Sequence, residues 1–551
     1  SVSDNNRGEI TMHKRTIISF VIVLAIMGGL MLRIYDLSGR PLRQAAERQA
    51  GLTVVVANTR GTIYDSQLRP FVNGETEYRV SVTQNPKAIA ALAGCVDGAV
   101  LEELTSRLQQ GKPVVSVVDP LPSPAEGLTI YKTPMRYSGR LLAPHVVGYL
   151  DGDGLKGATG AELVFDNRLS QATGKLTVTY TVDAVGKPLE GIAPVISNTL
   201  NKAKAGVILT IDMDIQNIAE TVAKRYMTKG AVVVMEPKTG RIVAMVSLPD
   251  FQPDTLGEAL ENPDSPLINR ALSNYNCGSV FKIVTTCAAL EANIPVKTEF
   301  NCAGYAQIGD IKFHCHNRLG HGTLNMSDAF AQSCNPYFIQ LALLAGGPSL
   351  SNMSVALGFD RPVFLAEGWK TARAVLPSDT QLISPAAVGN LAFGQGSLMA
   401  SPVHIAQLVA AVVNDGDIIR PTLQKGTIDA DGVVTKLPPA PTQTVFSKTT
   451  AAILRQLMIY AVENGTGLSA RPFDDGAGGK TGTAETGIKV KDKTILQGWF
   501  AGFYPAKNPE YVITVLAEDT DGTGGKASPV FKYIGEELAM LKKSREMKKT
   551  E

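Results

Sequence analysis

The chain has 551 residues, of which 44% are hydrophobic and 19% are charged, and its 53 basic and 51 acidic residues leave a formal net charge of +2. This length exceeds what one hydrophobic core usually serves, so we expect several domains. The balanced charge gives no indication of nucleic-acid binding, and the composition is that of a folded chain rather than a disordered one.

The first predicted element is a membrane-spanning helix. Residues 16–32 contain no charged side chain, and as a helix they would extend about 26 Å, just enough with the next two apolar residues to cross a bilayer. A secretory signal peptide is the alternative, but residues 32–35 lack the small residues of a cleavage site. We therefore expect an anchor over residues 16–34, after a tail of residues 1–15.

The region after the anchor, residues 35–205, is rich in glycine and favours strands. Short apolar runs at 52–57 and 176–181 have strand character. The pattern contains no catalytic constellation. Because residues 191–205 are rich in turn formers, we place a domain boundary at residue 205.

Two pairs of apolar runs predict two β-hairpins in the remaining chain. One pair lies at 231–235 and 242–246, and the other lies at 498–503 and 511–516. Each pair is separated by a segment that contains proline. We therefore expect an antiparallel sheet to which both pairs contribute.

Helical patterns lie between the two predicted hairpins and after the second. They fill residues 280–460, and a further amphipathic helix at about 529–541 precedes a charged tail at 542–551. Strands at both ends with helices between them predict an α+β domain over residues 206–541, in which helices pack on one antiparallel sheet.

Ser279 and Lys282 form the only Ser-x-x-Lys sequence in the chain. At this spacing on a helix the two side chains share one face, one turn apart. A serine becomes a good nucleophile when a neighbouring base removes its proton. The pair is therefore a candidate nucleophile and base, although the same tetrad arises by chance in long chains.

Two more short motifs follow Ser279 in order. They are Ser-Cys-Asn at 333–335 and Lys-Thr-Gly-Thr at 480–483. Similar sequences occur at 3–5 and 238–240, but the first precedes the membrane segment and the second suits a hairpin turn. Only the set that begins with Ser279 keeps the order Ser-x-x-Lys, Ser-x-Asn, Lys-Thr-Gly.

This ordered set resembles that of the class B penicillin-binding proteins, which are peptidoglycan D,D-transpeptidases, and among them the penicillin-binding protein 2-like subgroup of elongation and sporulation. Gly-Gln-Gly at 394–396, Glu-Asn-Gly-Thr-Gly at 463–467 and Ala-Glu at 484–485 are also similar to the family. The resemblance covers about residues 35–541. One departure is Cys277, where the family usually has proline.

The resemblance implies the roles of the catalytic residues. Ser279 would attack the carbonyl of the penultimate D-Ala of a stem pentapeptide, and Lys282 would act as the base. A neutral lysine requires a pKa lowered by burial or by the nearby Lys480. Ser333 would relay the proton to the leaving amine, and Asn335 would hold the substrate amide.

The resemblance also implies how the substrate binds. Lys480, Thr481 and Thr483 would bind its terminal carboxylate. They would lie on an edge strand that the substrate joins through its backbone, where Gly482 permits close approach. The backbone N–H groups of Ser279 and Thr483 would stabilise the oxyanion.

Five of the six cysteines and three of the six histidines lie between residues 277 and 334. Among them, Cys302, Cys315, His321 and Cys334 offer three sulfurs and one imidazole, a common set for structural Zn²⁺. The penicillin-binding protein 2-like subgroup is similar in having zinc in this region. No organic cofactor is expected. Cys95, Cys277 and Cys287 are interpreted as packing residues.

Three alternatives to this zinc site remain open. A disulfide between Cys302 and Cys315 is chemically reasonable. A second alternative is that Cys334 is a small core residue and the cluster has no special role. One of the other histidines, His314 or His316, would also serve as the imidazole.

Two stretches of the front region, 60–65 and 157–162, resemble the pedestal domain of class B proteins. Their carboxylates raise the hypothesis of a glycosyltransferase and hence a bifunctional protein, but that activity needs a large helical domain. We therefore interpret residues 35–205 as a spacer and docking domain. By resemblance, its partner would be a membrane glycosyltransferase of the SEDS type.

The resulting hypothesis is a single-pass membrane D,D-transpeptidase that β-lactams inhibit covalently. Basic residues flank the anchor on both sides, so they do not set its orientation. A cell-wall substrate would place the amino terminus in the cytoplasm and the catalytic domain outside. The alternatives are a β-lactamase, which would also hydrolyse the acyl-enzyme, and a non-enzymatic β-lactam sensor or scaffold.

Overall fold

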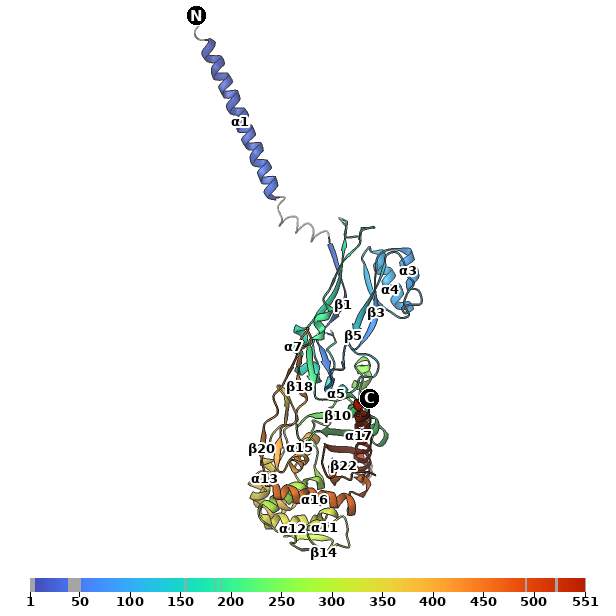
Figure 1. Ribbon diagram of the computed structural model, residues 1–551, viewed down its shortest axis with the longest axis vertical. Helices are drawn as coiled ribbons and strands as arrows, with labels where there is room; N and C mark the ends of the chain where they lie inside the picture. The colour runs from blue at the N-terminus through green and yellow to red at the C-terminus, as the bar shows by residue number, and fades with distance from the viewer. Residues whose placement is uncertain are drawn as a thin grey trace. The chain divides into compact units, whose positions relative to one another are not determined.

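The structure is a computed structural model. It describes residues 5–37, 51–152, 154, 156–183, 185–189, 191–490, 493–520 and 524–550. Figure 1 labels the helices and strands along the chain. Backbone contacts divide the chain into two compact units that alternate along the sequence. Unit 1 contains residues 1–58, 76–133 and 174–200. Unit 2 contains residues 59–75, 134–173 and 201–551.

The amino-terminal helix α1 (Asn5–Leu37) contains the expected apolar segment. Its stretch Lys14–Asp36 has a mean hydropathy of 2.5 and is not buried against the rest of the protein. Length and composition therefore allow this helix to cross a membrane, which is consistent with single-pass anchoring.

Unit 1 contains two small sheets and a pair of helices. The sheets have the strand orders β1-β6-β7 and β4-β3-β5. Their strands are β1 (Gly51–Thr59), β3 (Glu75–Val82), β4 (Val114–Val118), β5 (Leu128–Met135), β6 (Gly174–Thr181) and β7 (Val195–Asn198). The strands predicted at 52–57 and 176–181 are confirmed. Helices α3 (Pro86–Leu92) and α4 (Gly98–Gln109), which were not predicted, begin at the capping side chains of Asn85 and Asp97.

The centre of unit 2 is an antiparallel five-stranded sheet with the order β10-β9-β23-β22-β21. Its strands are β9 (Gly230–Met235), β10 (Ile242–Leu248), β21 (Gly478–Val490), β22 (Lys493–Tyr504) and β23 (Tyr511–Thr520). Both predicted hairpins are confirmed. Strands β9 and β10 are buried throughout, which explains why their sequences are continuously apolar.

Both faces of this sheet are covered, because alternate residues of a strand point to opposite sides. On one face Val232 and Val234 pack in a core with α8 (Met213–Tyr226) and α17 (Ala527–Thr550). On the other face Val233 packs in the larger core. That core includes α10 (Lys282–Glu291), α12 (Asn335–Ala345), α15 (Pro402–Val413) and α16 (Lys448–Asn464).

The smaller elements of unit 2 complete the fold. A four-stranded sheet of order β19-β18-β8-β2 joins β2 (Thr62–Tyr64), β8 (Gly206–Leu209), β18 (Gln424–Ile428) and β19 (Val434–Lys436). Four strand pairs are β11 (Phe300–Cys302) with β14 (Gly322–Leu324), β12 (Tyr305–Ile308) with β13 (Ile311–His314), β15 (Phe364–Ala366) with β16 (Trp369–Lys370), and β17 (Asp417–Ile419) with β20 (Thr442–Thr444). The other α-helices are α5 (Pro144–Val147), α6 (Gly160–Val164), α7 (Asp166–Gln171), α9 (Leu256–Glu261), α11 (Met326–Ala331), α13 (Gly347–Ala356) and α14 (Pro385–Ala392).

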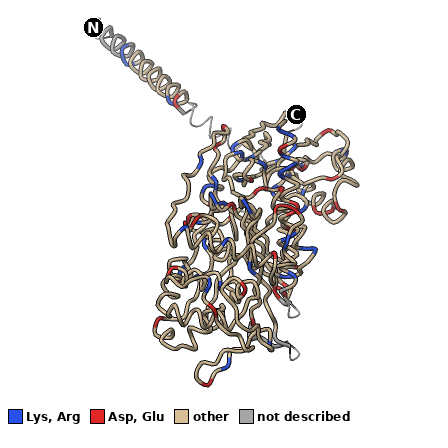
Figure 2. The backbone as a smooth tube through the Cα atoms, turned by 60° about the horizontal axis from the view of Figure 1, so that its bottom comes forward, with Lys and Arg blue, Asp and Glu red and all other residues tan. Residues whose placement is uncertain are grey.

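Helix α17 extends further than predicted. The sequence suggested a helix to residue 541 and a charged tail, but the structure continues the helix to Thr550. The extension is fixed by Arg545, which forms ion pairs with Asp212 at 2.8 Å and Asp214 at 2.6 Å. The basic end of the chain is therefore part of the fold. Elsewhere, acidic and basic residues are interspersed (Figure 2).

Two stretches assigned to the front domain, 59–75 and 134–173, belong to unit 2. They are joined by Glu162, which is fully buried and pairs with Arg136 at 2.5 Å and Arg60 at 3.4 Å. This carboxylate is thus neutralised by two arginines, which gives it a structural role. The domain boundary at residue 205 stays a prediction.

Candidate active site

Two glycines position Ser279. Gly278 has φ = 55°, and a Cβ atom there would lie 2.6 Å from the carbonyl oxygen of Thr483 on β21. The Gly278 N–H donates to the Gly394 carbonyl at 2.9 Å, and a Cβ on Gly394 would lie 2.0 Å from the Gly278 oxygen. Only glycine allows these approaches, so the Gly-Gln-Gly stretch at 394–396 supports the turn that carries Ser279.

Lys282 lies at the centre of the predicted catalytic residues. Ser279 is in a short 3₁₀ turn, Gly278–Phe281, and Lys282 begins α10. The Lys282 Nζ is 3.0 Å from Ser279 Oγ and 3.2 Å from Ser333 Oγ. It is also 2.7 Å from both the Ser333 carbonyl oxygen and Asn335 Oδ1. The structure therefore brings together the first two motifs.

The charge state of Lys282 follows from its surroundings. The side chain is fully buried, and this burial lowers its pKa to about 7. A neutral amine has two N–H donors and one lone pair. The two donors match the two oxygens at 2.7 Å, and the lone pair remains for the Ser279 hydroxyl proton. This geometry is that of a base beside a nucleophile.

Ser333 adopts a backbone conformation that is unusual for a serine. It follows α11 and precedes α12, and its φ is 53°. A non-glycine residue in this left-handed region costs about 1–2 kcal/mol. Asn335 opens α12, and its Nδ2 donates to the His314 carbonyl at 3.2 Å. The strained turn directs two side chains of one short motif toward the same lysine.

The third motif lies on β21, the edge strand of the five-stranded sheet, as predicted. Lys480 is fully buried, with its Nζ 5.7 Å from the centre of the Phe330 ring. Burial and the neighbouring Lys282 lower the pKa of Lys480 well below its usual value. The hydroxyls of Thr481 and Thr466 lie 2.7 Å apart, so the Glu-Asn-Gly-Thr-Gly stretch at 463–467 reaches the edge strand.

The motifs line one cavity of about 440 Å³. Its predicted lining residues are Ser279, Ser333, Asn335, Thr481, Gly482 and Thr483. His316, Thr466, Ser469, Gly525 and Ser528 also line it. Lys282 and Lys480 are fully buried next to lining residues of the cavity. Of the added residues, only Thr466 lies in a stretch that the sequence singled out, and His316 was considered only as a metal ligand.

A second cluster includes Cys334, which lies in the sequence between the cavity-lining residues Ser333 and Asn335. Ligand atoms of Cys302, Cys315, His321 and Cys334 all lie within 4.8 Å of one another. The Nδ1 atom of His321 is 3.6 Å and 3.5 Å from the sulfurs of Cys302 and Cys315. These four residues could hold a metal ion.

The structure disfavours each of the alternatives that involve a disulfide or another histidine. All six cysteines are free thiols, so the Cys302–Cys315 disulfide is absent from this structure. His314 is exposed on β13. His316 lies 3.9 Å from the Cys315 sulfur but lines the active-site cavity. His321 is therefore the imidazole that the geometry groups with the three thiols.

An antiparallel sheet with a serine–lysine pair beside its edge strand defines a class of active-site serine enzymes. Residues 230–536, more than half of the chain, match the family model of the penicillin binding protein transpeptidase domain. The chain belongs to this family of penicillin-binding proteins.

Individual relatives agree with this assignment. The chain is 31% identical to stage V sporulation protein D of Bacillus subtilis (strain 168) over 407 residues, which are 70% of this chain and 60% of that protein. It is 32% identical to the peptidoglycan D,D-transpeptidase PbpA of Mycolicibacterium smegmatis over 326 residues, 55% of this chain and 65% of that protein. The matched regions thus span less than two thirds of these relatives.

A solved structure extends the likeness to most of the chain. The D,D-transpeptidase domain of a peptidoglycan glycosyltransferase from Eggerthella lenta superposes with a TM-score of 0.63 at 25% identity. The superposition covers 88% of this chain and 99% of that one. The likeness therefore includes much of the region before residue 230, where the family model begins.

Proposed function

We propose that this protein is a peptidoglycan D,D-transpeptidase that cross-links stem peptides through an acyl-enzyme on Ser279. The observation that carries the proposal is the position of the Lys282 amine, buried and within 3.2 Å of both serine hydroxyls and of the Asn335 amide oxygen. A neutral amine at this point takes the Ser279 proton as the serine attacks.

The first half-reaction transfers an acyl group to the enzyme. Ser279 Oγ bonds to the carbonyl carbon of the penultimate D-Ala, and the oxyanion accepts hydrogen bonds from the N–H groups of Ser279 and Thr483. The peptide bond then breaks, and Ser333 passes the proton from Lys282 to the departing amine of the terminal D-Ala. The product is an ester on Ser279.

The second half-reaction forms the cross-link. An amine of a second stem peptide attacks the ester carbonyl and gives a proton back through Ser333 and Lys282 to Ser279. Before acylation, Lys480, Thr481 and Thr483 hold the terminal carboxylate of the first peptide, which leaves with the terminal D-Ala. Asn335 and the edge of β21 near Gly482 hold its backbone. A β-lactam follows only the first half-reaction and leaves the enzyme inhibited.

The test is labelling by a fluorescent penicillin. Ser279→Ala should abolish labelling, while Ser170→Ala, at an exposed serine of α7, should label like the wild type. Lys480→Ala should slow labelling, and Lys238→Ala, in the hairpin turn with the same Lys-Thr-Gly spelling, should not. Labelling that persists in Ser279→Ala would refute the assignment. Loss of the label within seconds would favour a β-lactamase.

We also propose that the thiol–imidazole cluster holds a structural Zn²⁺. Tetrahedral zinc with bonds of about 2.3 Å to sulfur and about 2.0 Å to nitrogen separates these atoms by about 3.5 Å. The sulfur–nitrogen distances of 3.6 Å and 3.5 Å fit this value. All four positions would be protein ligands, so the ion would stabilise the fold. Cys334 lies between Ser333 and Asn335 and would fix the catalytic turn.

The remaining proposals concern the cellular setting. Because peptidoglycan lies outside the membrane, residues 1–15 would be cytoplasmic and the catalytic unit extracytoplasmic. Residues 35–205 would act as a spacer and docking domain for a SEDS-type membrane glycosyltransferase. Protease treatment of intact cells tests the orientation, since only extracytoplasmic segments would be cut.

A further inference from the structure

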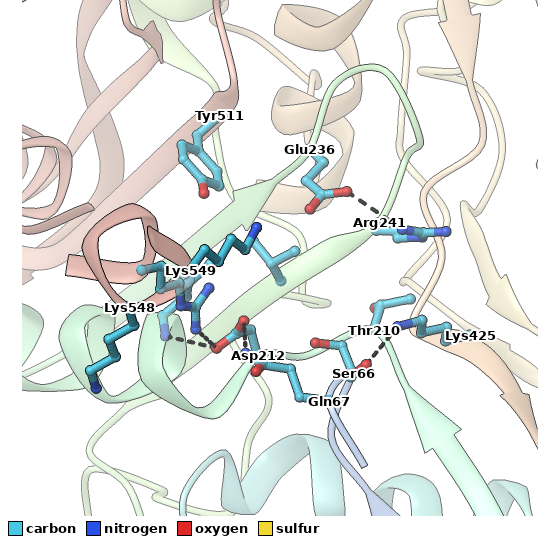
Figure 3. A pocket seen from close by; sticks show the side chains of 13 residues that line it. Ser66, Gln67, Thr210, Asp212, Glu236, Arg241, Lys425, Tyr511, Lys548 and Lys549 are labelled. Atoms are coloured by element: carbon cyan, nitrogen blue, oxygen red, sulfur yellow. Dashed lines mark hydrogen bonds and ion pairs between the residues drawn. The ribbon is translucent and has the colours of Figure 1, made fainter. Parts of the chain in front are cut away.

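Unit 2 contains a second cavity of about 440 Å³ that shares no lining residue with the active site. Its walls come from the turn after β2, the ends of β9, β10 and β23, and the helices α8 and α17 (Figure 3). In the five-stranded sheet, β10 and β9 are at the opposite side from β21. The cavity is therefore a separate site.

The lining of this cavity is predominantly basic. The basic residues are Arg241, Lys425, Arg545, Lys548 and Lys549, and the acidic residues are Asp212 and Glu236. Lys and Arg residues gather at this carboxyl-terminal end of the chain (Figure 2). An excess of positive charge around a hollow attracts negatively charged groups.

The two acidic groups are already paired. Asp212 accepts from Arg545 at 2.8 Å and from Gln67 at 2.7 Å. Glu236 lies 4.0 Å from Arg241. Among the residues that the structure describes, no carboxylate lies within ion-pair distance of Lys425, Lys548 or Lys549. Three cationic groups are thus left for a ligand.

Arg545 determines where the terminal lysines lie. Residues three and four positions apart lie near one another on a helix, so Lys548 and Lys549 follow Arg545 on α17, although the Lys548 side chain points away from Asp212 (Figure 3). In Figure 3 the Lys549 side chain extends over the cavity from α17. Residues 542–551 were predicted to be a charged tail, but Arg545, Lys548 and Lys549 form one wall of the site.

Lys425 and Tyr511 contribute polar groups from other walls. Lys425 is half-buried, and its Nζ donates to the Ser66 carbonyl at 2.5 Å. Burial, Arg241 and Lys436 lower the pKa of Lys425, and Asp65 and Glu236 offset this only in part, so an anion beside Lys425 would favour its charged form. The Tyr511 hydroxyl points toward the cavity (Figure 3) and has no hydrogen-bond partner within the described part of the chain.

We propose that this cavity binds a ligand that carries two or more clustered oxyanion groups, phosphates or carboxylates, on Lys425 and Lys549. A volume of about 440 Å³ is larger than a single such group requires. A smaller cavity of about 260 Å³ shares Ser66, Gln67 and Lys425 with it and adds the apolar side chains of Leu68, Ile208 and Val434. It provides room for the rest of the ligand.

Calorimetric titration of the full chain at fixed ionic strength tests this site. The probes are sodium pyrophosphate, for phosphates, and the dipeptide L-alanyl-D-glutamate, for carboxylates. We expect saturable binding of at least one probe, and the probe that binds identifies the source of the anion. Lys425→Gln and Lys549→Gln should each weaken it about tenfold. Lys543→Gln, at an exposed lysine of α17 outside the cavity, should bind like the wild type.

Penicillin labelling of each variant provides the fold control, because neither Lys425 nor Lys549 lies near the active site. All three variants should label at the wild-type rate. If Lys425→Gln fails to label, the exposed Lys549 variant decides the outcome. Absence of saturable binding for both probes, or equal affinities in the wild type and the labelling-competent variants, would overturn the proposal.

Discussion

Replacement of Gly278 by alanine tests how the turn before the nucleophile is held. The new Cβ would lie 2.6 Å from the Thr483 oxygen and 2.9 Å from its carbonyl carbon, distances at which backbone must move. A side chain at φ = 55° also costs about 1–2 kcal/mol. With overpacking of about 1–3 kcal/mol, we expect Gly278→Ala to destabilise the protein by about 2–5 kcal/mol.

Gly309 provides a matched control for this substitution. It has the same φ of 55°, but a Cβ atom added there would have no atom within 4 Å. Gly309→Ala should therefore show the backbone cost alone, about 1–2 kcal/mol, and should acylate normally. Gly278→Ala should also displace Ser279 from Thr483 and slow acylation about a hundredfold, the effect of losing one oxyanion donor.

The assays for this pair are thermal unfolding and the rate of acylation by a fluorescent penicillin. If the two alanine variants lose the same free energy of unfolding, the added Cβ of residue 278 does not crowd the Thr483 carbonyl. Wild-type acylation by Gly278→Ala would refute the inference that this glycine sets the position of the nucleophile.

Three further predictions concern charge and metal. Burial lowers the pKa of Lys282 to about 7 and the neutral amine is the base, so acylation should slow about tenfold from about pH 8 to about pH 6; a rate that is flat over this range argues against Lys282 as base. Chelator treatment or Cys302→Ser should lower the melting temperature, and a pure, reduced protein without metal by elemental analysis would remove the zinc proposal. Arg136→Ala should destabilise by about 3–5 kcal/mol because it deprives the buried Glu162 of one of its two arginines, whereas Arg107→Ala, in an exposed pair, should change stability by under about 1 kcal/mol; equal effects in urea unfolding would contradict this.

The sequence was enough to predict that the three short motifs lie together, and the structure places them around one cavity. Their residue types and order were enough to expect Ser279, Lys282 and the β21 edge strand in one place. The strands β9, β10, β22 and β23 were also predictable, since short apolar runs that are bounded by turn formers favour strands over helices.

Other features depended on contacts between distant residues. Residues 59–75 and 134–173 belong to unit 2, where Arg60 and Arg136 pair with Glu162. Local sequence patterns do not reveal these ion pairs. The extension of α17 depends on Asp212 and Asp214, more than three hundred residues before Arg545. Ser469 and Ser528 reach the cavity through tertiary packing and carry no sequence signal.

The most direct measurement is the intact mass of the purified protein after incubation with a penicillin, followed by peptide mapping. We expect one added penicillin per chain, on the peptide that contains Ser279, and no adduct in Ser279→Ala. An adduct on another residue, or no adduct in the folded wild-type protein, would contradict it.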